Sequence, residues 1–230
     1  MSQHLVIGLG EIGSSLQRVI HADGIGYGDF APQEAYKFIH ICYPYSEEFV
    51  KSVTDYAKEF QAEYVVVHST VPLGTCNKIQ RYVSCTHSPV RGVHPTMDEG
   101  IRTLTKFFGG KDAQIVADEF EKMGVDTITT KNSKNTEAGK MWSTTQYGLF
   151  IIMMHQIKDY CDEQGVDFDI VYRQFNETYN EGYLKLGRPE VVRPALKYMS
   201  GKIGGHCVIP NCELLGTDIG DFILKSNKKL

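Results

Sequence analysis

The stretch His4–Gly13, with the sequence HLVIGLGEIG, decides the fold of this chain. Its apolar run Leu5–Ile7 predicts a short buried strand, and a helical stretch from Ser14 to about His21 follows. Glycines separate the two. In a dinucleotide-binding turn the first glycine makes the tight turn, the second lets a pyrophosphate approach the backbone, and the third lets helix and strand pack closely. The pattern predicts such a turn, whose cofactor-binding residues are Gly8, Gly10, Glu11, Ile12 and Gly13.

An acidic residue, Asp29, follows this turn a little nearer to Gly13 than the usual ribose-binding carboxylate. It lies in the stretch Gly24–Phe30, which can end a second strand. If Asp29 binds the ribose, it favours NAD over NADP. The alternative is a solvated aspartate in a turn. Because the chain from the first helix to Lys37 is too short for a full crossover helix, this dinucleotide-binding unit is expected to be trimmed.

The next hundred residues alternate between strand and helix patterns. The predicted strands are Lys37–Cys42, Tyr64–His68, Ser84–His87 and Val125–Thr129, and the predicted helices between them are Glu47–Phe60, Thr75–Tyr82 and Ala113–Met123. Strands that alternate with helices indicate a parallel sheet with right-handed crossovers. The fold class is therefore α/β, with a Rossmann-type parallel sheet in residues 1–130.

Residues 131–230 read as an all-helical domain. Asn135–Gln164 carries no proline and ends at Gly165, and Asp167 caps a second helix that ends near Gly187. The stretch Tyr147–Ile157, YGLFIIMMHQI, is too apolar to face water on one side. We expect a homodimer in which a partner subunit covers this central helix. Burial of the helix within one subunit is the alternative.

Bulk composition excludes several function classes. The chain has 230 residues, 42% hydrophobic and 23% charged, with a net charge of −4 and a pI near 6.1. This acidic balance argues against a nucleic-acid partner. No apolar run reaches the ~18 residues of a membrane span, and no signal-peptide core is present. The six cysteines are scattered without a CxxC pair, which indicates free thiols in a reducing cytoplasm and no metal site.

A second glycine-rich stretch, Gly201–Asn211, reads GKIGGHCVIPN and places Cys207 between glycines and a proline. Glycines allow positive φ and close approach to a ligand. Such a loop can hold a thiol at an open site, where it could attack a carbonyl. The alternative is a surface turn beside a packed, inert cysteine.

The order of motifs resembles the UDP-glucose/GDP-mannose dehydrogenase family, within the wider group of 6-phosphogluconate and β-hydroxyacid dehydrogenases. The matching stretches are GLGEIG (Gly8–Gly13), HSTVPLGT (His68–Thr75), SPVRGVHP (Ser88–Pro95), NTEAGKMWSTT (Asn135–Thr145) and GGHCVIPN (Gly204–Asn211). They cover nearly the whole chain but only the first two of that family's three domains. The resemblance implies NAD as cofactor and a twofold oxidation of a sugar-nucleotide alcohol by way of an enzyme thioester.

The same resemblance implies roles for single residues. Cys207 matches the nucleophile, Lys140 matches the helix lysine that stabilises an oxyanion, and Thr70 matches a threonine near the nicotinamide and catalytic water. From the residues alone, Lys140 can also be a solvated helix lysine, and Thr70 a simple cap between strand and loop.

Departures from the family pattern concern the hydrolytic half of the reaction. Thr144 stands where the family has an asparagine, and Asn211 where it has an aspartate. Val90 replaces the glutamate that acts as base in thioester hydrolysis, and His94 replaces a further glutamate. His94 can serve as an acid or base, since imidazole titrates near neutrality, or it can be structural. The loss of carboxylates puts the double oxidation in doubt.

These observations predict an NAD-dependent oxidoreductase that transfers hydride from a polar alcohol, either a sugar nucleotide or a smaller substrate. Arg91 and Arg193 are candidate substrate cations, or else ordinary surface cations. One alternative is a single-step β-hydroxyacid-type dehydrogenase, in which Lys140 is the acid/base and Cys207 only lines the pocket. Another is a degenerate nucleotide-binding protein without activity.

Overall fold

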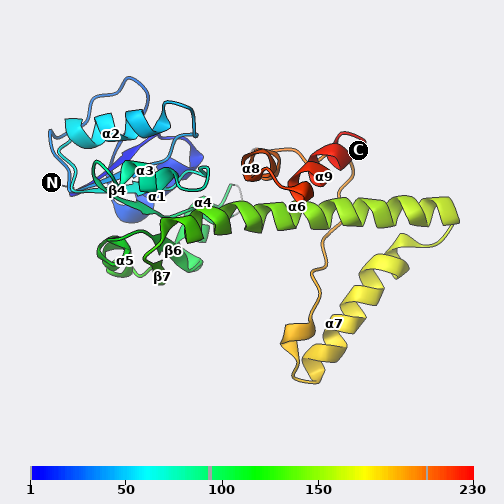
Figure 1. Ribbon diagram of the computed structural model, residues 1–230. Helices are drawn as coiled ribbons and strands as arrows, with labels where there is room; N and C mark the ends of the chain where they lie inside the picture. Colours follow the sequence, from blue (N-terminus) through cyan, green and yellow to red (C-terminus); the bar gives the residue numbers. More distant parts are fainter. Residues whose placement is uncertain (1, 93–94, 206) are drawn as a thin grey trace. The chain divides into compact units, whose positions relative to one another are not determined.

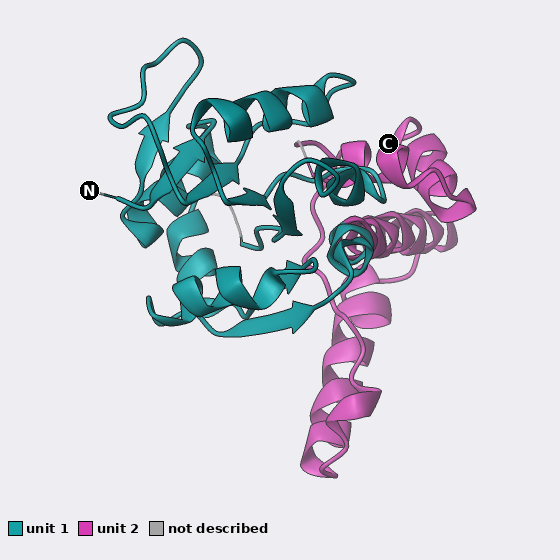
Figure 2. Cartoon of the chain, turned by 60° about the vertical axis from the view of Figure 1, so that its left-hand side comes forward, with its two compact units in different colours: residues 1–140 teal, residues 141–230 magenta. Residues whose placement is uncertain are grey.

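The computed structural model describes residues 2–92, 95–205 and 207–230. The chain divides into two compact units, Met1–Lys140 and Met141–Leu230, which Figure 2 colours separately. This division falls within a long helix, whereas the sequence predicted a domain boundary at residue 130. The assignment of the first domain to the cofactor and the second to substrate and dimerisation stays a prediction.

The first unit is built on one seven-stranded sheet (Figure 1). Its strands are β1 His4–Ile7, β2 Asp23–Ile25, β3 Phe38–Ile41, β4 Tyr64–Val67, β5 Ser84–His87, β6 Lys106–Gly109 and β7 Thr127–Thr130. They lie in the order β2-β1-β3-β4-β5-β6-β7, and all pairs are parallel except β5 with β6. The apolar and β-branched runs that pack well in a pleated sheet became its central strands. This mostly parallel sheet confirms the predicted fold class.

Helices cover both faces of the sheet. They are α1 Glu11–Ile20, α2 Phe49–Glu59, α3 Thr75–Ile79, α4 Met97–Thr103 and α5 Ala113–Glu121. Because successive strand residues point to opposite faces, Leu5 and Ile7 pack with α2 and α3. Val6 lies on the other face, in the core formed with α1, α4 and α5. The strands β1, β3 and β4 therefore contribute to two hydrophobic cores, one on each face.

The sequence prediction agrees with the structure at one crossover and fails at another. Residues 26–37 hold no helix, so the expectation of a trimmed unit is confirmed. Helix α4 and strand β6 were not predicted. Lys106 opens β6, and a charged residue at the start of a four-residue strand hides the apolar pattern that marks a strand.

Helix α6, Ser133–Gln164, is 32 residues long and nearly matches the predicted range. In the second unit its residue Ile152 packs with apolar residues of α8 Val208–Leu215 and α9 Asp218–Asn227. Gly148 permits this approach, since a Cβ there would lie 2.5 Å from Cγ1 of Val208. Ile152 and Met154 are thus buried within one subunit, in agreement with the alternative to a dimer contact at these two residues.

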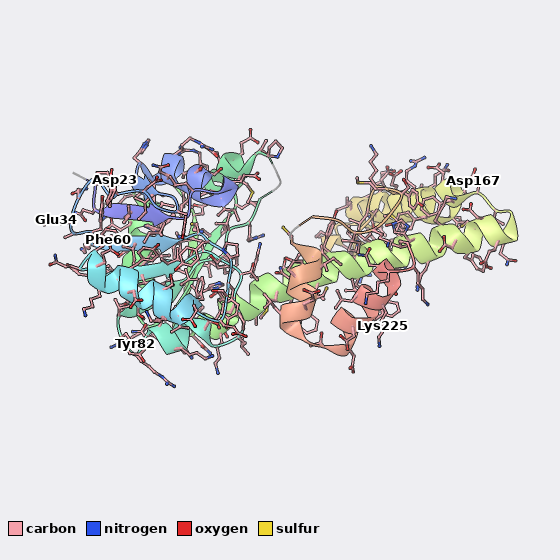
Figure 3. All side chains as sticks on the ribbon, turned by 90° about the horizontal axis from the view of Figure 1, so that it is seen from above. Asp23, Glu34, Phe60, Tyr82, Asp167 and Lys225 are labelled. Carbon is pink, nitrogen blue, oxygen red and sulfur yellow. The ribbon has the colours of Figure 1, made fainter. Side chains whose placement is uncertain are left out.

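The turn after α6 leads into a poorly covered helix. Asp167, labelled in Figure 3, caps this turn, because its Oδ1 accepts the N–H of Asp169 at 2.8 Å. A π-helical turn, Asp169–Gln174, continues as α7, Phe175–Lys185, which diverges from the end of α6 (Figure 1). Helix α7 contains no buried residue, and Phe175 is 69% exposed. Its apolar side chains are left without a core in the single chain.

The segment after α7 passes through a 3₁₀ turn, Pro189–Val191, and returns in extended form. It packs locally: the N–H of Leu196 donates to the hydroxyl of Tyr172 at 2.9 Å, and the Tyr198 ring contacts His155 and Phe168 edge-on. Within the described ranges, no helix is both long and apolar enough to cross a membrane.

Candidate functional site

The glycine turn at the carboxyl end of β1 has the geometry that a bound phosphate requires. Gly8 has φ of 96°, and the Cβ of any other residue would lie 3.1 Å from the backbone after β3. At Gly13 a Cβ would lie 1.9 Å from the Gly8 carbonyl oxygen. At Gly10, the N-cap of α1, a Cβ would meet nothing within 4 Å. Two glycines are thus demanded by packing, while the third borders open space beside the helix N-terminus.

Two further predicted residues, Glu11 and Ile12, form the first turn of α1. Glu11 is exposed and Ile12 is half-buried. Their backbone N–H groups lie at the N-terminus of a helix, whose positive dipole end is suited to an anion.

Asp29 lies beyond the end of β2, which stops at Ile25. It is exposed, and its Oδ2 accepts the backbone N–H of Gly26 at 2.8 Å. This contact fits the alternative of an aspartate that closes its own turn. The ribose-binding role stays a prediction.

The loop after β4 is tied to its neighbours. The hydroxyl of Ser69 donates to the Tyr43 carbonyl at 2.6 Å, and the Nε2 of His87 lies 3.2 Å from the Ser69 carbonyl. Thr70 follows Ser69 and is half-buried. Because carboxyl ends of neighbouring parallel strands meet at one edge, Thr70 shares that edge with the glycine turn.

Lys140 lies on α6 and reaches the loop after β5. Its Nζ donates to the Val90 carbonyl at 2.9 Å. Val90 itself is 2% exposed and packs in the core beneath α1 and α4. The lysine is therefore held on the loop backbone and is not a solvated helix residue. At the position of the expected glutamate an apolar side chain fills the core.

Glu137, one turn before Lys140, fixes α6 against the loop after β4. Its carboxylate accepts the N–H of Gly74 at 2.5 Å and that of Cys76 at 2.9 Å. Glu137 is buried. These bonds satisfy donors at the start of α3, and they position the lysine-bearing turn of α6 at the carboxyl edge of the sheet.

Cys207, Thr144 and Asn211 lie in the second unit and are described within it. Cys207 is exposed at the N-cap of α8, after Gly201 and Gly205, whose φ values are 89° and 78°. Asn211 is 3% exposed, and its Nδ2 has no hydrogen-bond partner among the residues that the structure describes. Thr144 is half-buried on α6. The thiol is thus accessible, while the amide is enclosed. His94 lies outside the described residues.

The two arginines engage neighbours in their own units. Nη1 of Arg91 donates to the Thr105 carbonyl at 3.4 Å, and its guanidinium lies over the Phe107 ring. The guanidinium of Arg193 stacks on Tyr179 at 3.7 Å from the ring centroid. Both contacts fit the alternative of surface cations, and a substrate role stays a prediction.

A cluster of buried titratable residues was not predicted as part of any site. His4, His40 and His68 lie on one face of the sheet, next to Lys106 of β6, which is 4% exposed. Burial lowers the pKa of Lys106 to about 7, assisted by the positive charge of Lys140. The sequence signal for the cluster was a histidine inside or beside three of the predicted strands, which apolar periodicity alone does not reveal.

Sequence comparison matches the chain to no protein-family model and to no curated protein. Solved structures do match. A UDP-D-ManNAc dehydrogenase from Pyrococcus horikoshii is 15% identical over 98% of this chain and 68% of its own, with a TM-score of 0.75. A UDP-glucose dehydrogenase from Pyrobaculum islandicum is 15% identical over 100% of this chain and 68% of its own, with a TM-score of 0.69.

A 3-hydroxyisobutyrate dehydrogenase from Mycobacterium tuberculosis is 13% identical over 100% of this chain and 94% of its own, with a TM-score of 0.71. The chain thus spans about two thirds of the length of the two sugar-nucleotide enzymes and almost all of the hydroxyacid enzyme. At these identities the likeness concerns the fold. The chain has the fold of the sugar-nucleotide and hydroxyacid dehydrogenases, as its motifs predicted.

Proposed function

We propose that this protein is a nicotinamide-dependent oxidoreductase that transfers hydride between a polar alcohol and NAD. One observation carries the proposal: a glycine turn with open space at Gly10 shares the carboxyl edge of the sheet with Lys140, which is fixed on the Val90 carbonyl. In open α/β sheets ligands bind at this edge. The backbone N–H groups of Gly10, Glu11 and Ile12 would hold the pyrophosphate. Bound NAD would supply the hydride acceptor.

The chain's own residues would handle the substrate proton. Lys140 can hold the hydroxyl of the substrate and take its proton as hydride leaves, which is the work of a general base. Thr70, next to Ser69 on the same edge, would orient the reacting hydroxyl. The backbone bond to Val90 fixes the lysine side chain, so that less motion has to be restricted on binding.

A single-step reaction on a small hydroxyacid is the favoured form of this function. Val90 and Asn211 carry no carboxylate, so neither can act as the base in thioester hydrolysis. The match along almost the full length of a hydroxyacid dehydrogenase supports the same form. Sugar-nucleotide oxidation through Cys207 is the second candidate, supported by the exposure of that thiol.

The test is NADH absorbance with the purified full-length chain, across hydroxyacids and sugar nucleotides, with NAD and NADP in parallel. We expect reduction of NAD by at least one hydroxyacid, and its loss in Lys140→Ala. Arg188→Ala is the matched control for loss of a cation, because Arg188 is exposed in the other unit and pairs with Glu190. Binding of NAD without turnover on any substrate would instead support the non-enzymatic alternative.

We further propose a cytoplasmic homodimer. The six cysteines are all free, which fits a reducing compartment. The uncovered apolar residues of the second unit, namely Tyr160, Ile170, Val171, Phe175 and Leu184, support a second copy as the cover.

A further inference from the structure

Three buried histidines are joined by hydrogen bonds across neighbouring strands. The Nδ1 of His4 lies 3.0 Å from the Nε2 of His40, and the Nδ1 of His40 lies 3.0 Å from the Nε2 of His68. The Nδ1 of His68 lies 2.7 Å from the Ser88 carbonyl oxygen. The rings also stack, with centroids 5.3 Å apart at both steps. We call these three residues the histidine ladder.

The ladder runs diagonally over three neighbouring strands, β1, β3 and β4, from their amino ends to their carboxyl ends. His4 opens β1 in register with Phe38, whereas His40 is in register with Val6, two residues further along. His68 follows the end of β4, two residues beyond Val66, the partner of His40. The ladder therefore begins at the amino edge of the sheet and ends at the carboxyl edge, where the glycine turn lies.

The Ser88 carbonyl sets the direction of every bond in the ladder. A carbonyl oxygen only accepts, so the Nδ1 of His68 carries a hydrogen and its Nε2 accepts from His40. By the same reasoning His40 and His4 are also Nδ1–H tautomers. The remaining acceptor is the Nε2 of His4, 3.9 Å from Oε2 of Glu119 on the partly exposed side of α5. All donors point from the amino edge towards Ser88.

Lys106 lies at the inner end of the ladder. Its Nζ is 3.2 Å from the Ser88 carbonyl and 3.4 Å from the Nδ1 of His68. The ammonium position is enclosed by the rings of Phe108 and Phe120, at 5.7 and 5.5 Å from their centroids. Because Lys106 is only 4% exposed, its proton has little direct access to water. The bonds to Ser88 and the ladder are its polar contacts among the described residues.

We propose that the histidine ladder is a proton relay through which Lys106 exchanges its proton with solvent at the amino edge of the sheet. When a proton binds the Nε2 of His4, the Nδ1 proton of His4 passes to Nε2 of His40. The Nδ1 proton of His40 passes to Nε2 of His68, and the Nδ1 proton of His68 passes to the neutral Nζ of Lys106. One proton enters, one arrives, and each ring becomes the Nε2–H tautomer. The reverse sequence unloads the lysine and restores the tautomers.

The surrounding charges are compatible with such a relay. Burial lowers the pKa of His40 and His68 well below its usual value, so both rings stay neutral between transfers. Glu119, Lys122 and Lys37 face His4; Lys106 faces His40; Lys106 and His87 face His68. Cys42 and Lys140 face Lys106. Because Lys106 titrates near pH 7 while the rings stay neutral, its amine is the natural end of the path.

The charge on Lys106 acts on the candidate site. Lys106 bonds the Ser88 carbonyl and Lys140 bonds the Val90 carbonyl, so the two cations flank one three-residue segment. The charges of Lys106 and Lys140 repel each other, so gain or loss of the proton on Lys106 changes the electrostatic potential at Lys140. This consequence for turnover rests on the proposed function, whereas the relay does not. Lys106 is accordingly a positioning residue.

The test measures the exchange of the Lys106 Nζ protons with water by nuclear magnetic resonance of the ¹⁵N-labelled full chain, below its pKa. The substitution His40→Phe keeps an aromatic ring but removes the ring nitrogens that would carry the proton. We expect exchange slower by roughly tenfold or more, since it then requires local opening of the core. His4→Phe, which can keep the stacking on Phe38, removes the entry point and should slow exchange likewise. His87→Asn alters a buried histidine outside the ladder and should leave the rate unchanged.

The opposite results would overturn the relay. If the histidines only fill space, their replacement loosens the core, and exchange at Lys106 stays the same or becomes faster. Well above pH 7, where Lys106 is neutral, ring ¹⁵N shifts that assign the Nε2–H tautomer to any ladder histidine would also overturn the relay. In turnover, Lys106→Met should remove an inflection near pH 7 from the kcat/KM profile. If the wild type reduces no cofactor, the proposed function fails while the exchange rates still decide the relay.

Discussion

At the residue scale, the three glycines of the Gly8–Gly13 turn are needed for different physical reasons. Gly8 and Gly13 are required by the fold, because a side chain at either would strike backbone atoms. Gly10 is different, since the space beside it is open and its backbone is extended. A substitution at Gly10 can therefore separate ligand binding from folding, which a substitution at Gly8 or Gly13 cannot do.

Gly10→Val should abolish NAD binding while the chain keeps its fold, because the branched side chain would occupy the space of the pyrophosphate. Titration calorimetry measures the affinity, and circular dichroism checks the fold. Gly182→Val is the matched control, because a Cβ at this position on α7 also meets nothing within 4 Å. Equal NAD affinity in a folded Gly10→Val protein would contradict the assignment of the turn.

Cys207 and Lys140 distinguish the two forms of the proposed reaction. In a single-step dehydrogenase Lys140→Ala should lose roughly 10²–10⁴-fold of turnover, as acid–base groups do, while Cys207→Ala keeps most of it. In a thioester route Cys207→Ala should abolish acid formation. The measurement is NADH formed per substrate consumed. Two equivalents of NADH, together with an acyl group trapped on Cys207, would refute the single-step form.

At the element scale, the stability of the central strands depends on the protonation state of their buried histidines. His40, His68 and His87 are buried on β3, after β4 and on β5. Burial lowers the pKa of His87 to about 3, and the pKa of His40 and His68 lies well below the ordinary value of 6.5. Sheet stability therefore depends on these rings remaining neutral.

The protein should lose stability in acid. Because the folded-state pKa values are depressed, the unfolded chain binds more protons below pH 6.5, so the free energy of unfolding falls as pH falls. Each histidine contributes about 1.4 kcal/mol per pH unit below that value, until its folded pKa is reached. Urea unfolding between about pH 7.5 and about pH 5, where histidine titrates, measures how the free energy of unfolding changes with pH.

His40→Phe should reduce the change in unfolding free energy per pH unit by the contribution of about one proton. His21→Asn is the control, because His21 is exposed and adopts a left-handed backbone that asparagine tolerates, and it should leave the slope unchanged. A slope identical in His40→Phe and in the wild type would show that His40 is not neutral and buried in the folded chain.

At the scale of the whole molecule, the second unit exposes apolar side chains that one copy does not cover. Phe175 and Tyr160 are 69% and 60% exposed, and α7 has no buried residue. An amphipathic helix gains most of its stability from packing of its apolar face. A partner copy would provide that packing.

The wild type should therefore scatter light as a dimer of the 25.9 kDa chain, and Phe175→Glu should shift it towards the monomer. A buried unpaired carboxylate destabilises an interface, which is the reason for this choice. Tyr27→Glu, at a fully exposed aromatic of the first unit, should leave the mass unchanged. A wild type that is monomeric at micromolar concentration would reject the homodimer.

Features that depend on neighbours along the chain could be predicted from the sequence. Glycine spacing after an apolar run predicted the turn at Gly8–Gly13, alternating runs predicted the parallel strands, and unbroken helical composition predicted α6. Each follows from local backbone sterics and side-chain periodicity. The trimmed crossover at residues 26–37 could also be predicted, because chain length alone limits what it can hold.

Contacts between segments that are far apart in the chain could be learned only from the folded structure. The antiparallel strand β6 brings Lys106 to Ser88, and the register of β1, β3 and β4 aligns three histidines that are far apart in sequence. The bond from Lys140 to the Val90 carbonyl also joins distant segments. Local patterns cannot predict such contacts, because a shift in strand register moves side chains to other neighbours or the other face without changing the pattern itself. Burial, and with it the lowered pKa of Lys106, arises only once those strands are paired.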